Sequence, residues 1–596
     1  MRTGGYAPIG DYAAIGDGRT VALVARDGVV DWLPFPTMGA PTVFGALLDA
    51  RSGGRFMLTP EGDFDVERRY LPRTNVLETT FRTSGGSARI TDALTLQDGG
   101  LLPWTELARR VEGLTGSVRL RWRVEPRFGF GAERTVVERR DGVPLARGQR
   151  ARLALLVWDV GDLAVGGDAI SGGFDLAGGE AALLTCVLVE DGPIPFPPRE
   201  EVETRLDGTS ASWERWVSGH EYDGPWPEAV ERSALALKLL TYSPSGAMMA
   251  AGTTSLPEKL GADRNYDYRF TWVRDTSFAL DALTGLGFRE QVHASLAWLL
   301  QAVGRTAPHL VPLYTLDGQV PRGIEELDLE GYRGSRPVVH GNAATSQLQL
   351  GCYGDLLETI ELYVREGNSL DPATGTQIRE IADLLCEIWR NDDSGIWELP
   401  DLRPYTISKI NSWVALDRAI HLAEQGQVPT DGVDRWRREA ELVRRYVEER
   451  CYSDERQTYL FYAESDELDA ATLLAARNGF ADPNGKRMRG TIEAVRAELG
   501  AGGPLLYRYS GQQGEEGAFL ACSFWLVEAL ARAGRVDEAR ETMDALLELA
   551  NDLGLYSEEI DPEAHELLGN FPQGLTHLAL INAAASIAAE EEDGDG

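Results

Sequence analysis

The sequence has little of what nucleic-acid-binding and membrane-spanning proteins depend on. Its 596 residues include 93 acids against 58 lysines and arginines, which gives a net charge of −35. The lysines are confined to Lys238, Lys259, Lys409 and Lys486. Because a surface of that charge repels phosphate, we expect no nucleic acid partner. No uninterrupted apolar stretch reaches the roughly 20 residues of a membrane helix, so we expect no membrane association.

Cysteine and histidine are equally sparse. The five cysteines are scattered and have no metal-ligand spacing, which favours reduced core residues in a cytoplasmic protein. The first residues lack the apolar segment of a signal peptide, in agreement with a cytoplasmic location. Neither paired histidines nor a glycine-rich phosphate loop is present, so we expect no metal and no cofactor. The composition leaves open whether the chain forms a homo-oligomer.

The residue pattern changes once along a chain too long for one ordinary core. Up to residue 215, short β-prone runs alternate with turns, which predicts an antiparallel β-sandwich over 1–215. After a linker at 216–227 the apolar period becomes about 3.6, which predicts helices over 228–590 before an acidic tail at 591–596. Twelve helices are predicted, at about 228–242, 275–286, 288–304, 342–366, 377–390, 408–425, 434–450, 467–476, 486–499, 516–534, 536–552 and 574–589. This pattern fits a helical repeat array as well as a barrel.

One stretch, residues 265–277, holds four charges and four aromatic rings: Asn265-Tyr-Asp-Tyr-Arg-Phe-Thr-Trp-Val-Arg-Asp-Thr-Ser277. A helix start needs only one capping side chain and an acid in its first turn. Aromatic faces beside fixed arginine and aspartate suit a sugar, because C–H faces stack on rings while hydroxyls take charge-assisted hydrogen bonds. A capped helix with core aromatics would explain the same residues.

Two other segments each present a glutamate in a loop. Glu398 lies in Asp392-Asp-Ser-Gly-Ile-Trp-Glu-Leu-Pro400, where Trp397 is placed to shield the carboxyl from water and raise its pKa. Glu558 lies in Leu555-Tyr-Ser-Glu-Glu-Ile-Asp-Pro562 beside Glu559. In an extended loop these two side chains point to opposite sides, so only one faces a pocket.

Together these segments resemble glycoside hydrolase family 15, the glucoamylase, glucodextranase and trehalase family. Tyr268 to Asp275 is similar to its Tyr-x-x-x-Trp-x-Arg-Asp segment, and the two glutamate segments are similar to its general-acid and general-base segments. The stretches 4–17 and 31–36 resemble the N-terminal domain of its bacterial and archaeal members. The resemblance, not the periodicity, implies an (α/α)6 barrel and an inverting exo-acting α-glucosidase.

The resemblance also implies the site. Glu398 is expected as the general acid and Glu558 as the general base, about 6.5–9.5 Å apart across the sugar. Glu398 is expected to have the raised pKa and Glu558 to stay ionised in a more polar setting. The expected substrate-binding residues are Tyr268, Trp272, Arg274, Asp275, Arg336, Trp397 and Arg508. His340 and Gly334 depart from the Asp and Trp of fungal members, on the leaving-group side.

The resemblance implies a small carbohydrate substrate and leaves several alternatives. A trehalose-like glucoside is the first choice, because of the N-terminal domain, and maltose, isomalto-oligosaccharide or dextrin follows closely. An inverting disaccharide phosphorylase shares this architecture but needs no second carboxylate. A non-catalytic sugar-binding protein is the third alternative. The presence of both glutamates argues against it.

Overall fold

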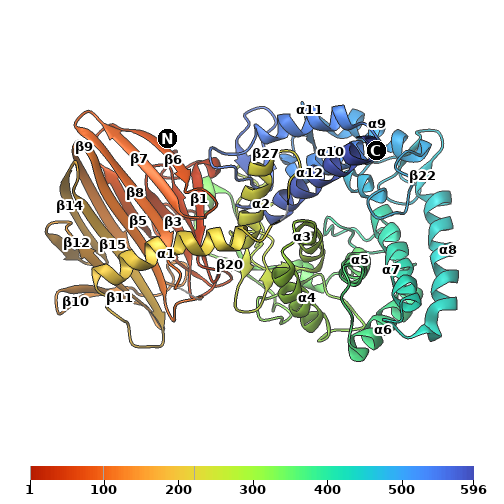
Figure 1. Ribbon diagram of the computed structural model, residues 1–596, viewed down its shortest axis with the longest axis horizontal. Helices are drawn as coiled ribbons and strands as arrows, with labels where there is room; N and C mark the ends of the chain where they lie inside the picture. The colour runs from red at the N-terminus through yellow and green to blue at the C-terminus, as the bar shows by residue number, and fades with distance from the viewer. Residues whose placement is uncertain (1, 98–99, 221, 596) are drawn as a thin grey trace.

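The computed structural model describes residues 2–97, 100–220 and 222–595 and consists of an antiparallel β domain followed by a helical domain (Figure 1). All named strands of the β domain pair antiparallel. They are β1 (Tyr12–Gly16), β2 (Val21–Ala25), β3 (Val29–Pro34), β4 (Thr42–Phe44), β5 (Arg55–Pro60), β6 (Asp65–Tyr70), β7 (Leu77–Thr83), β8 (Gly86–Leu94), β9 (Thr105–Glu125), β10 (Val136–Arg140), β11 (Val143–Arg147), β12 (Ala151–Trp158), β13 (Leu163–Gly166), β14 (Ala169–Ala177) and β15 (Ala181–Glu190).

The long strand β9 joins two groups of strands. Its first half pairs with β8 and β15, and its second half pairs with β5 and β14. In the second half Val118, Leu120, Trp122 and Val124 are buried, while the residues between them are exposed. This alternation is that of a sheet with one face on a core. The core contains residues of both groups of strands.

Helix α1 (Arg199–Val217) corrects the predicted end of the β domain, because the sandwich was expected to continue to residue 215 and a linker to follow. Its buried residues Val202, Leu206, Trp213 and Val217 lie on one stripe at helical spacing. The stripe is hard to recognise in the sequence because most other positions of this helix are polar or charged. In Figure 1, α1 runs along the strands toward the helical domain.

The twelve predicted helical regions are all helical in the structure. They are α2 (Pro227–Leu239), α3 (Val273–Gly285), α4 (Arg289–Val303), α5 (Gly351–Arg365), α6 (Pro372–Ile388), α7 (Thr406–Glu424), α8 (Val433–Arg450), the 3₁₀ helix η5 (Ala470–Ala475), α9 (Lys486–Leu499), α10 (Leu520–Arg532), α11 (Val536–Leu547) and α12 (Gly574–Asp595). The acidic tail was predicted wrongly, because α12 continues through residues 591–595. Glutamate and alanine are good helix formers, so nothing before Gly594 favours an end.

Six of these helices contact one another in a closed cycle: α3, α5, α7, η5, α10 and α12, with α12 again touching α3. The other six pack outside them. Burial follows this division, because α7 and α10 are buried around most of their circumference. The outer helix α8 buries a single stripe, and its remaining face is polar. Among the described helices none is both long and apolar enough to cross a membrane.

The β domain is hydrogen-bonded to the segment that leads into α3. The Trp32 indole donates to the carbonyl of Gly252 at 2.9 Å, and Arg269 Nη1 donates to the carbonyl of Ala40 at 2.7 Å. Both donors are buried. The residues just before α3 are therefore held from both domains.

Candidate active site

Glu398 lies in the loop between α6 and α7 and meets the start of α3. The Trp272 indole donates to Glu398 Oε1 at 2.6 Å, and Gln347 Nε2 donates to the Glu398 backbone carbonyl at 2.9 Å. The residue is only partly covered, but its carboxyl is closely surrounded by protein, and this burial raises its pKa. The positive charge of Arg274 and the Trp272 hydrogen bond act in the opposite direction. The raised pKa agrees with the expectation for a proton donor.

Trp397 has a different role from the expected shield. Its indole donates to Asp469 Oδ1 at 2.9 Å, and the Arg508 guanidinium lies over its ring at 5.5 Å. Glu398 has φ of 61°, the left-handed region, so the chain turns sharply between these neighbouring side chains. The contact with the Glu398 carboxyl comes instead from Trp272.

Arg274 and Asp275 lie in the first turn of α3. Arg274 Nε donates to Asp275 Oδ2 at 3.0 Å, and Arg274 Nη1 donates to the carbonyl of Ile396 at 2.7 Å. Both residues act on the pKa of Glu398, so they lie on its side of the site. An aspartate in the first turn is also stabilised by the helix dipole.

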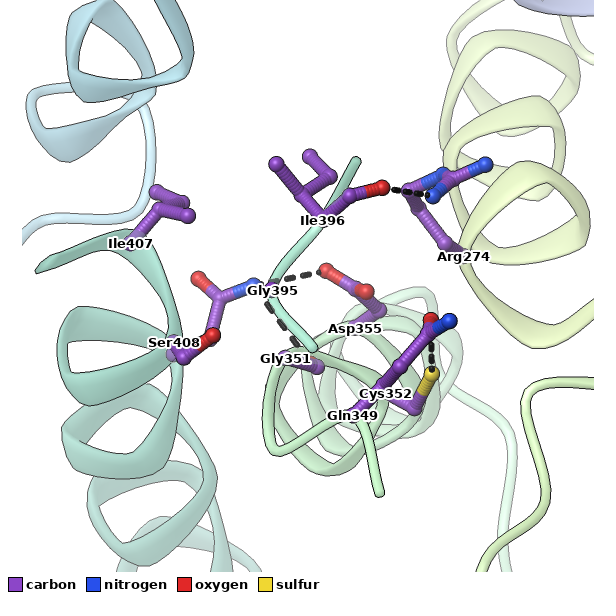
Figure 2. A pocket seen from close by; sticks show the side chains of 10 residues that line it. Arg274, Gln349, Gly351, Cys352, Asp355, Gly395, Ile396, Ile407 and Ser408 are labelled. Carbon is purple, nitrogen blue, oxygen red and sulfur yellow. Dashed lines mark hydrogen bonds between the residues drawn. The ribbon is translucent and has the colours of Figure 1, made fainter. Parts of the chain in front are cut away.

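A small cavity lies beside Arg274 (Figure 2). Its volume of about 10 Å³ is close to what one water molecule needs. Arg274 lines it from α3, Asp355 from α5 and Ser408 from α7. Asn411 Nδ2 donates to Asp355 Oδ1 at 3.0 Å, and burial raises the pKa of Asp355 to about 7.

Glu558 directly precedes strand β27 (Glu559–Ile560) and is almost fully buried. Its carboxyl is hydrogen-bonded to Tyr268, and its pKa is raised to about 8, first by burial and then by the charge of Glu258. The raised pKa contradicts the expected polar setting with an ionised carboxylate. Gly569 makes room for Glu558, because a Cβ there would lie 2.6 Å from Oε2.

Arg508 is the centre of a buried charge cluster that sequence reasoning missed. Arg508 Nε donates to Glu516 Oε1 at 2.7 Å, Nη2 donates to Glu258 Oε2 at 2.9 Å, and Glu559 Oε1 is 3.8 Å from Nη2. Arg264 forms a second ion pair with Glu516. These carboxylates come from segments up to 300 residues apart, and nothing in their local sequence distinguishes them from the other acids.

Among the described residues, Glu258, Glu516 and Glu559 are the group whose ligand atoms lie close enough to hold a metal ion, all within 4.8 Å. The guanidinium groups of Arg508 and Arg264 already lie against these carboxylates. In this arrangement the two arginines supply the positive charge that the acids need.

Tyr268 connects the two candidate catalytic carboxyls. Its ring meets the Trp272 ring edge-on at 5.5 Å, and its hydroxyl side is bonded to Glu558. Trp272, which contacts Tyr268, donates to Glu398, so the carboxyls of Glu398 and Glu558 both lie near Tyr268, although they are 160 positions apart in the sequence. Aromatic rings, two carboxyls and fixed arginines thus surround one place, as an acid and a base acting on a sugar require.

Arg336 is the predicted site residue that the structure does not join to this set. Its side chain is 57% exposed and its ion pair is with Asp328, at 3.8 Å. His340 turns toward the β domain side, where it lies 3.0 Å from Arg269 Nη2 and 3.6 Å from Asp267. The other predicted residues, Tyr268, Trp272, Arg274, Asp275, Trp397, Glu398, Arg508 and Glu558, are linked by the contacts above.

Comparison with known proteins identifies the family. The model of the glycosyl hydrolases family 15 matches residues 224–585, and a trehalase-like N-terminal model matches residues 3–157. A trehalase of Mycolicibacterium smegmatis is 35% identical, covering 99% of this chain and 92% of its own. A trehalase of Thermoplasma volcanium is 32% identical, covering 98% and 94%.

Among solved structures, a bacterial glucoamylase complexed with acarbose has a TM-score of 0.72 at 14% identity, over 99% of this chain and 96% of that one. This likeness concerns the fold, a glucoamylase-like arrangement of an antiparallel β domain and a helical domain. The family model, which spans more than half of the chain, and the full-length relatives show that the chain belongs to glycosyl hydrolase family 15 and is a glycoside hydrolase.

Proposed function

We propose that the chain is an inverting, exo-acting α-glucosidase and that trehalose is its preferred substrate. The observation that carries the proposal is the approach of Glu398 and Glu558 to the same tyrosine, one carboxyl held by Trp272 and the other by Tyr268. The printed names of the full-length relatives, all trehalases, support the choice of substrate.

In the proposed reaction Glu398 gives its proton to the oxygen between the two sugars, and Glu558 takes a proton from water. The water oxygen then attacks the anomeric carbon from the face opposite the leaving group. Arg274 and Asp275 hold the hydroxyls of the attacked glucose, Trp272 packs beside it, and Tyr268 borders the water. Arg508 balances the charge of the acids beside the base, and Trp397 packs against its guanidinium.

Glu558 must lose a proton before it can act as a base. Substrate hydroxyls and the attacking water would give its carboxylate new hydrogen bonds, and these favour the charged form. A second carboxylate in this place favours water as the nucleophile over the phosphorylase alternative, because phosphate needs no general base.

The same proposal includes the finer architecture. We infer that the strands of the domain predicted over 1–215 form a two-layered β-sandwich that ends before α1, and that the linker follows α1. The helices predicted over 228–590 form an (α/α)6 barrel that α12 completes. The shared core of the two strand groups and the closed cycle of six helices support this architecture. The five cysteines, all free and buried, support a cytoplasmic location.

Proton NMR of freshly mixed enzyme and trehalose tests the function. Inversion releases the attacked glucose as the β anomer and the leaving glucose as the α anomer, so the two should appear in equal amounts before mutarotation. Maltose, isomaltose, kojibiose, nigerose and dextrin, assayed in parallel, decide between trehalase and glucoamylase specificity. Absence of trehalose hydrolysis would refute the substrate, and α-glucose as the sole first product would refute inversion.

A further inference from the structure

Tyr266 is an aromatic residue of the sugar-binding stretch to which the mechanism above gives no task. Its side chain is 44% exposed, whereas Tyr268, Phe270 and Trp272 are covered to a much greater extent. The ring lies nearly parallel to that of Tyr268, at an interplanar angle of 9° and a centroid distance of 6.5 Å. Tyr266 therefore extends the row of rings that begins at Trp272 outward, away from Glu398.

The backbone that carries this exposed ring is held by hydrogen bonds. The Tyr266 carbonyl accepts hydrogen bonds from Ser255 N at 2.9 Å and from Asn570 Nδ2 at 3.0 Å. The flanking residues Asn265 and Asp267 are buried. A backbone ordered in this way lowers the entropy cost when the ring binds a ligand, which favours a stacking surface for a sugar.

Tyr266 also lies on the side of the general base. The pKa of its phenol group is raised to about 12, chiefly by burial, and the charges of Glu258, Arg508, Arg264 and Glu558 also act on it. Asn570, which donates to the Tyr266 carbonyl, accepts a backbone hydrogen bond from Glu558. The ring is thus tied to the same segment that carries the base.

We propose that Tyr266 is the platform on which the leaving sugar stacks, and therefore a determinant of specificity for an aglycone that is itself a pyranose. The inference rests on the proposed function and deepens it. In the proposed reaction the attacked glucose lies beside Trp272, Arg274 and Tyr268, so the second sugar lies farther out, where Tyr266 is the exposed ring. Arg264, partly exposed and bonded to Gln512, lies near enough to supply hydroxyl contacts.

The test compares a disaccharide with α-D-glucosyl fluoride, whose leaving group is not a sugar. Tyr266→Ala is expected to lower kcat/KM for trehalose by about 5–30-fold, the equivalent of about 1–2 kcal/mol for an aromatic contact. Its loss on the fluoride should be less than about twofold, because that substrate does not use the platform. Tyr266→Phe should stay near wild type on both, since stacking does not need the hydroxyl.

Phe196→Ala is the matched control, since it removes another exposed aromatic ring, on the β domain side. It should leave both substrates unaffected. Equal losses on trehalose and the fluoride in Tyr266→Ala, or no loss on trehalose, would overturn the platform while leaving the proposed function in place. A wild-type enzyme that releases fluoride but hydrolyses no disaccharide would overturn the proposed function as well.

Discussion

The two candidate catalytic carboxyls are held by different groups but share one property. Glu398 accepts a hydrogen bond from an indole, and Glu558 is bonded to a phenol. Burial raises both pKa values. Such a site is prepared for proton donation, whereas the base needs the substrate, the water or a change of pH to become ionised.

Replacing either carboxyl by an amide should abolish most of the activity. We expect Glu398→Gln and Glu558→Gln to lower kcat on trehalose by about 10²–10⁴-fold, the usual cost of losing a general acid or base. Azide should restore turnover to Glu558→Ala, as β-glucosyl azide, and not to Glu398→Ala, because a small anion replaces the activated water but not the proton donor. Near-normal turnover in Glu558→Gln would show that the base is another residue.

The charge of Glu258 should control the pH at which Glu558 becomes a base. Glu258, Glu559, Tyr268 and Arg508 face Glu558, and Glu258 is the strongest of the charges that raise its pKa. Activity requires ionised Glu558, so kcat/KM should fall as the pH drops below about 8. Glu258→Gln should lower that pKa and move the acidic limb of the profile down by about one unit.

The control for this shift is Glu515→Gln, an exposed neighbour of the charge cluster. It removes the same charge without touching Arg508, and its acidic limb should coincide with that of wild type. An unchanged limb in Glu258→Gln would mean that its negative charge does not act on the base.

Burial of Glu558 should also reduce stability at alkaline pH. Its folded-state pKa of about 8 exceeds the ordinary value of 4.5, so the folded chain binds this proton more tightly than the unfolded chain. The resulting stabilisation is complete below about pH 4.5 and is lost as the pH rises to 8. Glu558→Gln should therefore have a higher melting temperature than wild type at pH 9 but not at pH 4.5. At about 1.4 kcal/mol per pKa unit, the gain in free energy of unfolding at pH 9 is up to a few kcal/mol.

Melting curves by circular dichroism at the two pH values measure this difference. Glu563→Gln, an exposed residue of the same region, should show no pH-dependent gain. A Glu558→Gln protein that melts below wild type at pH 9 would show that the carboxyl is not destabilising there.

Among helices and strands, periodicity and motif order gave correct predictions where a pattern repeats. The amphipathic outer helices and the segment before α3 are examples, since their residues carry the signal locally. The sequence gives a weaker signal for α1, where one buried stripe lies among charges, and for η5, a single 3₁₀ segment at an inner position. Glu516 and the ionisation of Glu558 depend on burial against distant segments, which no local pattern records.

The residue that caps helix η5 also binds Trp397. Asp469 precedes the helix, accepts the N–H of Ala471 at 2.9 Å as its cap and also accepts the Trp397 indole. Asp469→Ala should therefore lower the melting temperature, since a lost cap alone costs about 1 kcal/mol. It should also weaken inhibition by glucose, because Trp397 lies beneath Arg508.

Asp469→Asn is the matched variant, because both donors reach Oδ1 and an amide oxygen at that position still accepts both hydrogen bonds. It should retain more stability and more glucose binding than Asp469→Ala. Loss of stability with unchanged glucose inhibition in Asp469→Ala would confine the residue to capping η5.

The two domains share the work of forming the site. The β domain donates from Trp32 to Gly252, and the segment that follows Gly252 carries Glu258, Tyr266 and Tyr268. Gly252 N in turn donates to the carbonyl of Pro572 at 3.3 Å, in the segment just after Glu558. The N-terminal domain thus supports, through Gly252, both the sugar-binding stretch and the segment after the base. We call this support bracing. The resemblance placed every site residue in the helical domain and did not predict it.

Trp32→Phe tests this bracing, because it removes the indole N–H and keeps an aromatic ring in the core. The smaller ring also leaves a cavity, and the control variant below shares that effect. The Gly252 carbonyl loses its indole donor, which should cost about 1–3 kcal/mol of stability and lower the melting temperature. If the bracing positions the site, kcat/KM of the folded protein should fall by at least about threefold. This is less than the roughly 100-fold that a 1 Å misplacement of catalytic groups costs, because the site is only loosened. Trp122→Phe is the control, because Trp122 is buried in the β domain and its indole N–H has no hydrogen-bond partner there. It should leave kcat/KM unchanged, and equal activity in the two variants would show that the β domain stabilises the chain without positioning the site.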